Sequence, residues 1–322
     1  MLYDEFGGRN TCLEISTQFY ARVAKDPVLR PFFGKTFTCA IEEFAAFLAQ
    51  LLGGPPEHAE RRWWLSLHES HRRFPLGPKH RDAWLACMSQ TLEHANLPEN
   101  QKTALRALFE RSSAYLIDQP NDQPIPLLAD SWNSQLTLDQ AVAAIHQGHP
   151  AEPLVSPFRP NQPVFARLLA LLIKKGQSLD FVDQALDSTL AQIPLAFGRT
   201  LLQEAAGAAQ VDIVKLLLTL NASPKHVLHS MANECRPQQH GAQIVHILAH
   251  AGADVNYHDT HQQTTPLHMA ARQGFTGIAQ ALIDCGAHIN ARDRKGETPL
   301  KRALNCRRPQ LAELLRAHNA TI

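Results

Sequence analysis

Residues 264–296 read TTPLHMAARQGFTGIAQALIDCGAHINARDRKG, and the stretch after them, 297–320, reads ETPLKRALNCRRPQLAELLRAHNA. The TPL step that begins at Thr265 returns at Thr298, which is a period of 33 residues. Self-similarity at this period is typical of chains built from stacked pairs of helices.

Two further copies lie upstream. The segment IVHILAHAGADVN at 244–256 matches IAQALIDCGAHIN at 278–290 with a period of 34. A weaker copy at 199–223 reads RTLLQEAAGAAQVDIVKLLLTLNAS. The pattern therefore extends well beyond the two clearest units.

The residue types at fixed places in the repeat have local reasons. Pro266 suits the first position of a helix, where its missing N–H costs nothing. Small residues such as Ala270 and Ala271 allow paired helices to approach closely. Gly252 and Gly286 are predicted to end the second helix of their repeats in a left-handed conformation.

This pattern resembles the ankyrin repeat, over about residues 198–321 and about four repeats, with 224–243 departing from the consensus. The resemblance implies an all-α solenoid with a concave face for an unknown protein partner. The residues expected at turn tips are Tyr257, His258, Asp259, His261, Arg292, Asp293 and Arg294. For each of them an ordinary solvated turn is the alternative.

The first 119 residues lack this repeat, and their apolar residues recur at helical intervals without strand-like alternation. Amphipathic helices are predicted at 12–26, 41–52, 81–95 and 100–118. A polar stretch with three prolines follows and predicts a break between domains. The predicted organisation is a first domain at 1–119, a linker at 120–130 and repeats at 131–322, with a degenerate first repeat at 131–197 and clearer repeats at 198–321.

Composition narrows the class of protein. The chain has 31 Lys and Arg against 30 Asp and Glu, which argues against a nucleic-acid partner or an anionic membrane bound by bulk charge. Six cysteines occur without a short metal or redox spacing, so reduced thiols in a cytoplasmic protein are expected. The longest apolar run, LLALLI at 168–173, is too short to span a bilayer.

Three histidines in HESHRRFPLGPKHRDAW (68–84) are the candidate ligands of the first domain. Around them lie GGRN near the start, FY in the first long helix, DPVLRPFF, a Phe-rich helix that ends in GGP, HRRF and RDAWLACM. That order of motifs over about residues 2–118 resembles the second group of truncated haemoglobins. The resemblance implies a two-over-two helical globin that holds haem b.

In that family the iron ligand is a histidine in a His-x-x-Phe step, thirteen residues before a tryptophan. His71 meets both conditions, with Phe74 and Trp84 at those places, so the resemblance implies that His71 is the proximal ligand. His68 and His80 meet neither condition and are expected at the surface.

The resemblance also implies a ligand pocket on the other face of the haem. Tyr20 matches the family's distal tyrosine, and Trp84 can donate a hydrogen bond through its indole N–H. Phe33 matches a position that packs an aromatic ring on the haem. Ile41 matches the place of the distal histidine of ordinary globins, and Ala45 would leave space for the ligand.

Some alternatives stay open on sequence grounds. Phe44, Phe47 and Leu48 form a stripe that suits the core and the haem pocket equally. The family often has proline where Arg73 stands, so Arg72 or Arg73 either faces a haem propionate or is simply solvated.

Two functions from different classes follow. In the first, the chain binds dioxygen or another diatomic gas at iron, for redox work such as nitric oxide or peroxide turnover or for gas sensing, and the repeats bind a protein. No dedicated catalytic motif decides whether it is an enzyme. In the second, the whole chain is an interaction scaffold with a haem-free globin domain.

Overall fold

The computed structural model describes residues 2–55, 58, 65–119, 121–236 and 240–322, and every regular element in these ranges is a helix. The prediction of an all-α chain is thereby confirmed. The chain divides into two compact units, one made of 1–144 with 153–164 and the other of 145–152 with 165–322. Each unit is described by itself.

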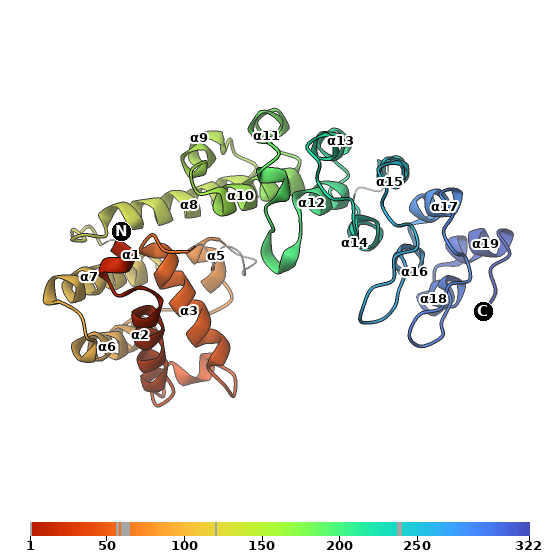
Figure 1. Cartoon of the computed structure of the whole chain (residues 1–322). Coiled ribbons are helices and arrows are strands. Elements are labelled where there is room, and N and C mark those ends of the chain that lie inside the picture. Colours follow the sequence, from red (N-terminus) through yellow and green to blue (C-terminus); the bar gives the residue numbers. More distant parts are fainter. Residues whose placement is uncertain (1, 56–57, 59–64, 120, 237–239) are drawn as a thin grey trace. The chain divides into compact units, whose positions relative to one another are not determined.

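The first unit is a helical bundle (Figure 1). Helix α2 packs against α3 and α6, and α6 packs against α7. Its helices are α1 (Leu2–Glu5), α2 (Gly8–Val23), α3 (Thr38–Leu51), α5 (Leu67–His71), α6 (Pro78–His94) and α7 (Glu99–Tyr115), with a 3-10 turn η1 (Arg30–Phe32). The four helices predicted from periodicity are present, and their ends differ from the prediction by a few residues.

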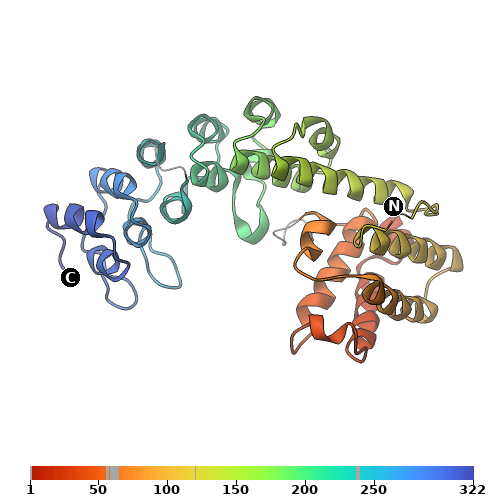
Figure 2. The same ribbon diagram turned by 180° about the vertical axis from the view of Figure 1, so that it is seen from behind.

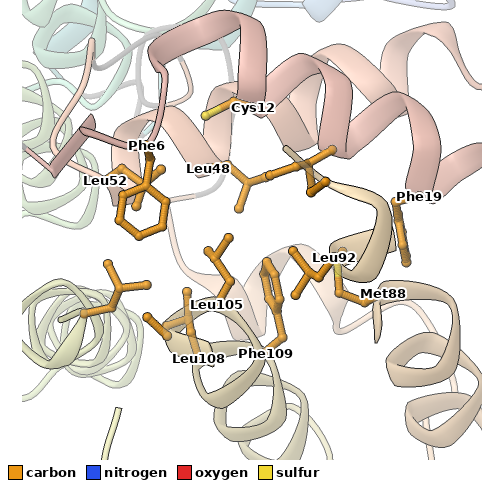
Figure 3. Close-up of a cluster of buried hydrophobic side chains, with 14 of the residues drawn as sticks. Phe6, Cys12, Phe19, Leu48, Leu52, Met88, Leu92, Leu105, Leu108 and Phe109 are labelled. Carbon is orange, nitrogen blue, oxygen red and sulfur yellow. The ribbon is translucent and has the colours of Figure 1, made fainter. Parts of the chain in front are cut away.

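The core of this bundle joins its early and late helices (Figure 3). Phe6 and Leu48 from the first half meet Leu105, Leu108 and other side chains of the second half, each at most 2% exposed. Burying each such side chain stabilises the fold by roughly 1.5–3 kcal/mol. The core thus fixes where α2, α3, α6 and α7 present their remaining faces.

Residues beyond 119 contribute to the same core. Ile125, Leu128 and Trp132 are at most 5% exposed and belong to this hydrophobic cluster. The ring of Trp132 lies 5.7 Å from that of Tyr115. The proline-bearing stretch expected to be a linker does interrupt the helices, but Ile125 and Leu128 in it are buried, because proline restricts the backbone without preventing burial.

Helix α8 (Ala129–Gln147) is the long yellow-green helix in Figure 2. Its residues up to Ala144 belong to the first unit, and its last residues, from Ile145, belong to the second. The residues expected to form a degenerate first repeat, 131–197, are therefore shared between the two units. The helices after α8 in that stretch are α9 (Glu152–Val155), α10 (Gln162–Lys175) and α11 (Leu179–Ala185), with 3-10 turns η2 (Ser156–Phe158), η3 (Leu190–Gln192) and η4 (Ala196–Gly198).

The rest of the second unit is a stack of helix pairs. The first helices of the pairs form one row and the second helices another, and each helix packs on its counterpart in the next pair (Figure 1). The pairs are α12 (Leu201–Gly207) with α13 (Val211–Thr219), α14 (Val227–Glu234) with α15 (Gly241–His250), α16 (Pro266–Gln273) with α17 (Thr276–Asp284), and α18 (Pro299–Asn305) with α19 (Pro309–Ala317).

The ends of these helices are fixed by caps that were not predicted from the sequence and by glycines that were. The Thr265 hydroxyl caps α16 by accepting the N–H of His268, and the His268 imidazole accepts the N–H of Thr265 at 3.1 Å. The other imidazole nitrogen bonds the carbonyl of Glu297 in the next repeat at 3.0 Å. Gly252 and Gly286 have φ of 88° and 87°, as predicted for residues that end the second helices.

Candidate functional site

A cavity of about 330 Å³ lies inside the first unit, between its helices. Its wall is mainly apolar and includes the aromatic rings of Phe19, Tyr20, Phe32, Phe33, Phe44, Phe47, Phe74, Trp84 and Phe109. Five of the seven residues singled out from the sequence meet here, namely His71, Tyr20, Phe33, Trp84 and Phe74. They come from separate segments between residues 20 and 84, so only the folded chain brings them together.

Ile41 and Ala45 are not brought to this cavity. The face of α3 that lines it carries Ala40, Phe44 and Phe47, which are spaced as one side of a helix. Ala45 is fully buried in the hydrophobic core instead. The register of α3 is thus one residue away from the one that the family resemblance implied.

The imidazole of His71 is held in one orientation. Its Nδ1 lies 2.8 Å from the carbonyl oxygen of Leu67 and 2.8 Å from the hydroxyl of Ser70, which itself donates to the Leu67 carbonyl. Because a carbonyl can only accept, we assign the proton to Nδ1, which leaves the lone pair on Nε2. Burial lowers the pKa of His71, so the ring stays neutral and able to bind a metal.

The two neighbouring histidines differ from each other. His68 stacks edge-on against Tyr115 at 5.3 Å, with Nε2 3.7 Å from Asp118, and does not line the cavity. His80 does line it, so the expectation of a plain surface residue is wrong there. Its Nδ1 accepts the N–H of Gly77 at 3.1 Å, which closes the first turn of α6.

A sequence signal for His80 existed. Gly77 precedes Pro78 at the start of α6, and His80 is the third residue of that helix, where a side chain can reach back to the cap. The ring of His80 then packs 5.1 Å from the ring of Phe32. Ser112 and Ser113, near the end of α7, also line the cavity and were missed because no quoted motif extends to them.

Tyr20 and Trp84 form an aromatic cluster on the wall of the cavity. The ring of Tyr20 lies 5.4 Å from that of Phe33. The indole of Trp84 packs 5.0 Å from Phe19 and 5.3 Å from Phe109. Such rings are positioned by their neighbours, and each of these two carries a polar group that can donate a hydrogen bond.

The arginines after His71 differ in position. Arg73 lines the cavity, with its guanidinium 4.8 Å from the centre of the Phe74 ring. Both arginines are exposed, but Arg72 is not part of the lining. Arg73 is therefore the one whose charge lies beside the cavity.

In the second unit, two of the expected tip residues hold the turns themselves. Asp259 accepts backbone N–H groups of His261, Gln262 and Thr264 at 2.7–3.0 Å. Burial alone would raise the pKa of Asp259, but these hydrogen bonds outweigh it and lower the pKa. Asp293, only 5% exposed, accepts two backbone N–H groups of its own turn at 2.8 and 2.9 Å.

The other tip residues are accessible to different degrees. His258, His261, Arg292 and Arg294 are exposed, whereas Tyr257 is half-buried and its ring lies 4.1 Å from that of His226. Among the described residues, no helix combines the length and the apolar character needed to cross a membrane.

Comparison with known proteins identifies two families in this chain. The model of bacterial-like globins matches residues 1–116, and the model of ankyrin repeats (3 copies) matches residues 228–322. The chain is 31% identical over 112 residues to group 2 truncated haemoglobin YjbI of Bacillus subtilis, which covers 35% of this chain and 85% of that protein. It is 33% identical over 116 residues to group 2 truncated haemoglobin 3-1 of Lotus japonicus, with 34% and 67% covered.

A solved structure, the haemoglobin of the thermophilic phototrophic bacterium Chloroflexus aurantiacus, is 36% identical and covers 36% of this chain and 97% of that one, at a TM-score of 0.35. On the strength of the two family models and the two truncated haemoglobins, the chain belongs, through residues 1–116, to the family of bacterial-like, group 2 truncated globins, and it carries ankyrin repeats at 228–322.

Proposed function

We propose that the first unit binds haem b with Nε2 of His71 as the axial ligand and takes up dioxygen or another diatomic molecule. One observation carries the proposal: the Leu67 carbonyl occupies Nδ1 of His71, so the lone pair of Nε2 is kept for a metal. Membership of the globin family leads us to expect haem, and the hydrogen bond on Nδ1 indicates that Nε2 is the atom that would bind the iron.

The remaining lining residues fit an apolar macrocycle. Rings such as Phe33, Phe44 and Phe74 give the cavity flat apolar walls that exclude water. Arg73, beside the cavity, suits the carboxylate of a propionate. When bound, haem supplies the iron that takes up the gas.

The chain's own residues would then hold the gas. The hydroxyl of Tyr20 and the indole N–H of Trp84 are donors on the cavity wall, and a partly negative ligand needs donors. A neutral hydrogen bond contributes about 0.5–1.5 kcal/mol, and 1.4 kcal/mol is a factor of about ten in an equilibrium constant. Two donors would thus slow ligand escape, which favours redox turnover or sensing over bulk delivery.

The second unit is proposed to bind a protein. Ankyrin arrays present turns and first helices to partners, and here the exposed side chains of these turns include His258, His261, Arg292 and Arg294. Asp259 and Asp293 of the same turns hold the loops in shape through backbone hydrogen bonds and are not offered as contacts.

The test is haem binding by the full-length chain. Wild-type protein mixed with hemin is expected to give an intense Soret band, and His71→Ala is expected to weaken haem binding at least tenfold. His68→Ala is the matched control, because it removes a nearby imidazole that does not line the cavity. A wild-type chain that stays colourless would contradict the proposal and favour the scaffold with a haem-free globin unit. Full haem retention with an unchanged spectrum in His71→Ala would refute the ligand assignment.

A further inference from the structure

A carboxylate from outside the matched globin segment is bonded to the helix that carries His71. Asp139, in α8, accepts the N–H of Leu67 at 2.9 Å and the N–H of His68 at 3.1 Å, one on each carboxylate oxygen. Its side chain is only 3% exposed. Residue 139 lies beyond the globin match at 1–116, so the family pattern assigns it no role.

Helix α5 depends on such contacts because it is a single turn. Five residues are too few for a helix to be stable by itself, and its first N–H groups have no partners inside the helix. The N–H groups of Glu69 and Ser70, which follow the pair bound by Asp139, go to the hydroxyl and the carbonyl of Ser66 at 3.1 Å each. Asp139 and Ser66 together satisfy the whole start of α5.

The same peptide group connects Asp139 to the imidazole. The His68 N–H and the Leu67 carbonyl belong to one peptide unit, with Asp139 bonded at its nitrogen end and Nδ1 of His71 at its oxygen end. A carboxylate on the N–H polarises the unit and makes its carbonyl a stronger acceptor. A stronger acceptor on Nδ1–H in turn makes Nε2 a better electron donor.

The carboxylate of Asp139 is itself oriented. Nε2 of Gln135, one turn earlier in α8, donates to it at 2.9 Å. Burial, followed by the nearby charge of Asp139, raises the pKa of Tyr115 to about 12. The carboxylate therefore has few other positions to adopt.

We propose that Asp139 is a positioning residue for the haem ligand: through the peptide unit between Leu67 and His68 it fixes α5 and strengthens Nε2 of His71 as a donor. This inference rests on the proposed haem function. It also makes α8, which continues past Ala144 into the second unit, part of the proximal side of the globin.

The test compares full-length Asp139→Asn with Asp130→Asn. Both replace an aspartate of α8 by its amide, but Asp130 is exposed, so it controls for the change of charge. In the haem-free chain, Asp139→Asn is expected to speed hydrogen exchange at the N–H groups of Leu67 and His68 by about tenfold. In the ferrous haem form, the iron–histidine stretching band should move to lower frequency, and haem transfer to an apoprotein acceptor should be roughly 10–100-fold faster.

The outcomes separate the two proposals. A colourless wild-type chain contradicts the haem function itself. A haem-loaded wild type in which Asp139→Asn matches Asp130→Asn in band position and haem transfer overturns this inference alone. Faster amide exchange with an unmoved band also overturns it, because a purely structural cap would behave in that way.

A second variant covers the case in which Asp139→Asn does not fold. Gln135→Leu keeps the carboxylate but removes its 2.9 Å hydrogen bond, so smaller changes in the same directions are expected. If Asp139→Asn is unfolded and Gln135→Leu equals the wild type in all three measurements, the inference is overturned.

Discussion

The two units of this chain use hydrogen bonds over different distances in sequence. In the repeats, the bond from His268 to Glu297 joins residues 29 apart, and the bond between His229 and Thr264 joins residues 35 apart. In the globin unit, the bond from Leu67 to Asp139 spans 72 residues, and the one from Gln101 to Glu5 spans 96. The repeats are held by neighbours about one period away, whereas the globin site is held by remote parts of the chain.

This contrast has consequences for stability. The stability of a repeat array is approximately the sum of the stabilities of its repeats and of the interfaces between neighbouring repeats. A substitution therefore destabilises its own repeat and, through the interfaces, the adjacent repeats. The globin bundle shares one core, so loss of a remote side chain weakens all of it. All four tryptophans, at 63, 64, 84 and 132, lie in the globin part, so tryptophan fluorescence follows that unit while far-UV circular dichroism follows the whole chain.

The largest effect is expected for Trp132→Ala. Removing this buried side chain from the globin core should lower the free energy of unfolding of the first unit by about 3–5 kcal/mol. The midpoint of the fluorescence transition in guanidinium, reported by the other tryptophans, measures the loss. An unchanged midpoint would mean that residues beyond 119 do not stabilise the globin bundle.

Leu282→Ala is the corresponding test in the repeats of the second unit. Leu282 is fully buried in α17, so the variant should lose about 2–5 kcal/mol within the repeats. The dichroism transition should move to lower denaturant and the fluorescence transition should stay in place. A shift of both transitions would contradict the independence of the two units.

His268→Ala should cost roughly 1–3 kcal/mol at pH 7.5, because the N–H of Thr265 and the carbonyl of Glu297 lose their partner. Burial lowers the pKa of His268 below 6.5, so the unfolded chain binds the proton more readily. The contribution of His268 is therefore complete above pH 6.5 and declines as the pH falls below it.

The difference between the wild type and His268→Ala should accordingly shrink at pH 5.5. Chemical denaturation followed by dichroism at the two pH values measures it, and His258→Ala, at an exposed position, is the control. A difference that stays constant or grows on acidification would show that His268 is not held neutral in the repeat.

The smallest effects are expected at two glycines of one repeat. Gly286 has a φ of 87°, so Gly286→Ala strains the end of α17 and should destabilise by about 1 kcal/mol. Gly277, inside α17, has open space around it, so Gly277→Ala should stabilise by up to about 1 kcal/mol. If both variants change the free energy of unfolding in the same direction, the contrast between the left-handed Gly286 and the helical Gly277 would be contradicted.

Much of the fold could be predicted from sequence because its signals are local. The period from Thr265 to Thr298 and the glycines that end second helices depend only on nearby residues, and they appear in the structure as predicted. Five of the seven residues singled out from the sequence line one cavity, because each was found within a short motif such as the step from His71 to Phe74, although folding is what brings these motifs together.

The rest required the folded chain. Ile41 and Ala45 miss the cavity because a difference of one residue in the register of α3 turns them away from it, and sequence spacing alone does not set that rotation. Asp139 reaches α5 only because Trp132 and its neighbours bury the start of α8 in the globin core. The sequence by itself determined the two kinds of helical architecture and singled out His71 as the candidate ligand, because periodicity and motif spacing are encoded locally. Only the tertiary structure decided which nitrogen of His71 is hydrogen-bonded to the backbone and which remote carboxylate bonds its helix, because both depend on contacts between residues that packing alone brings together.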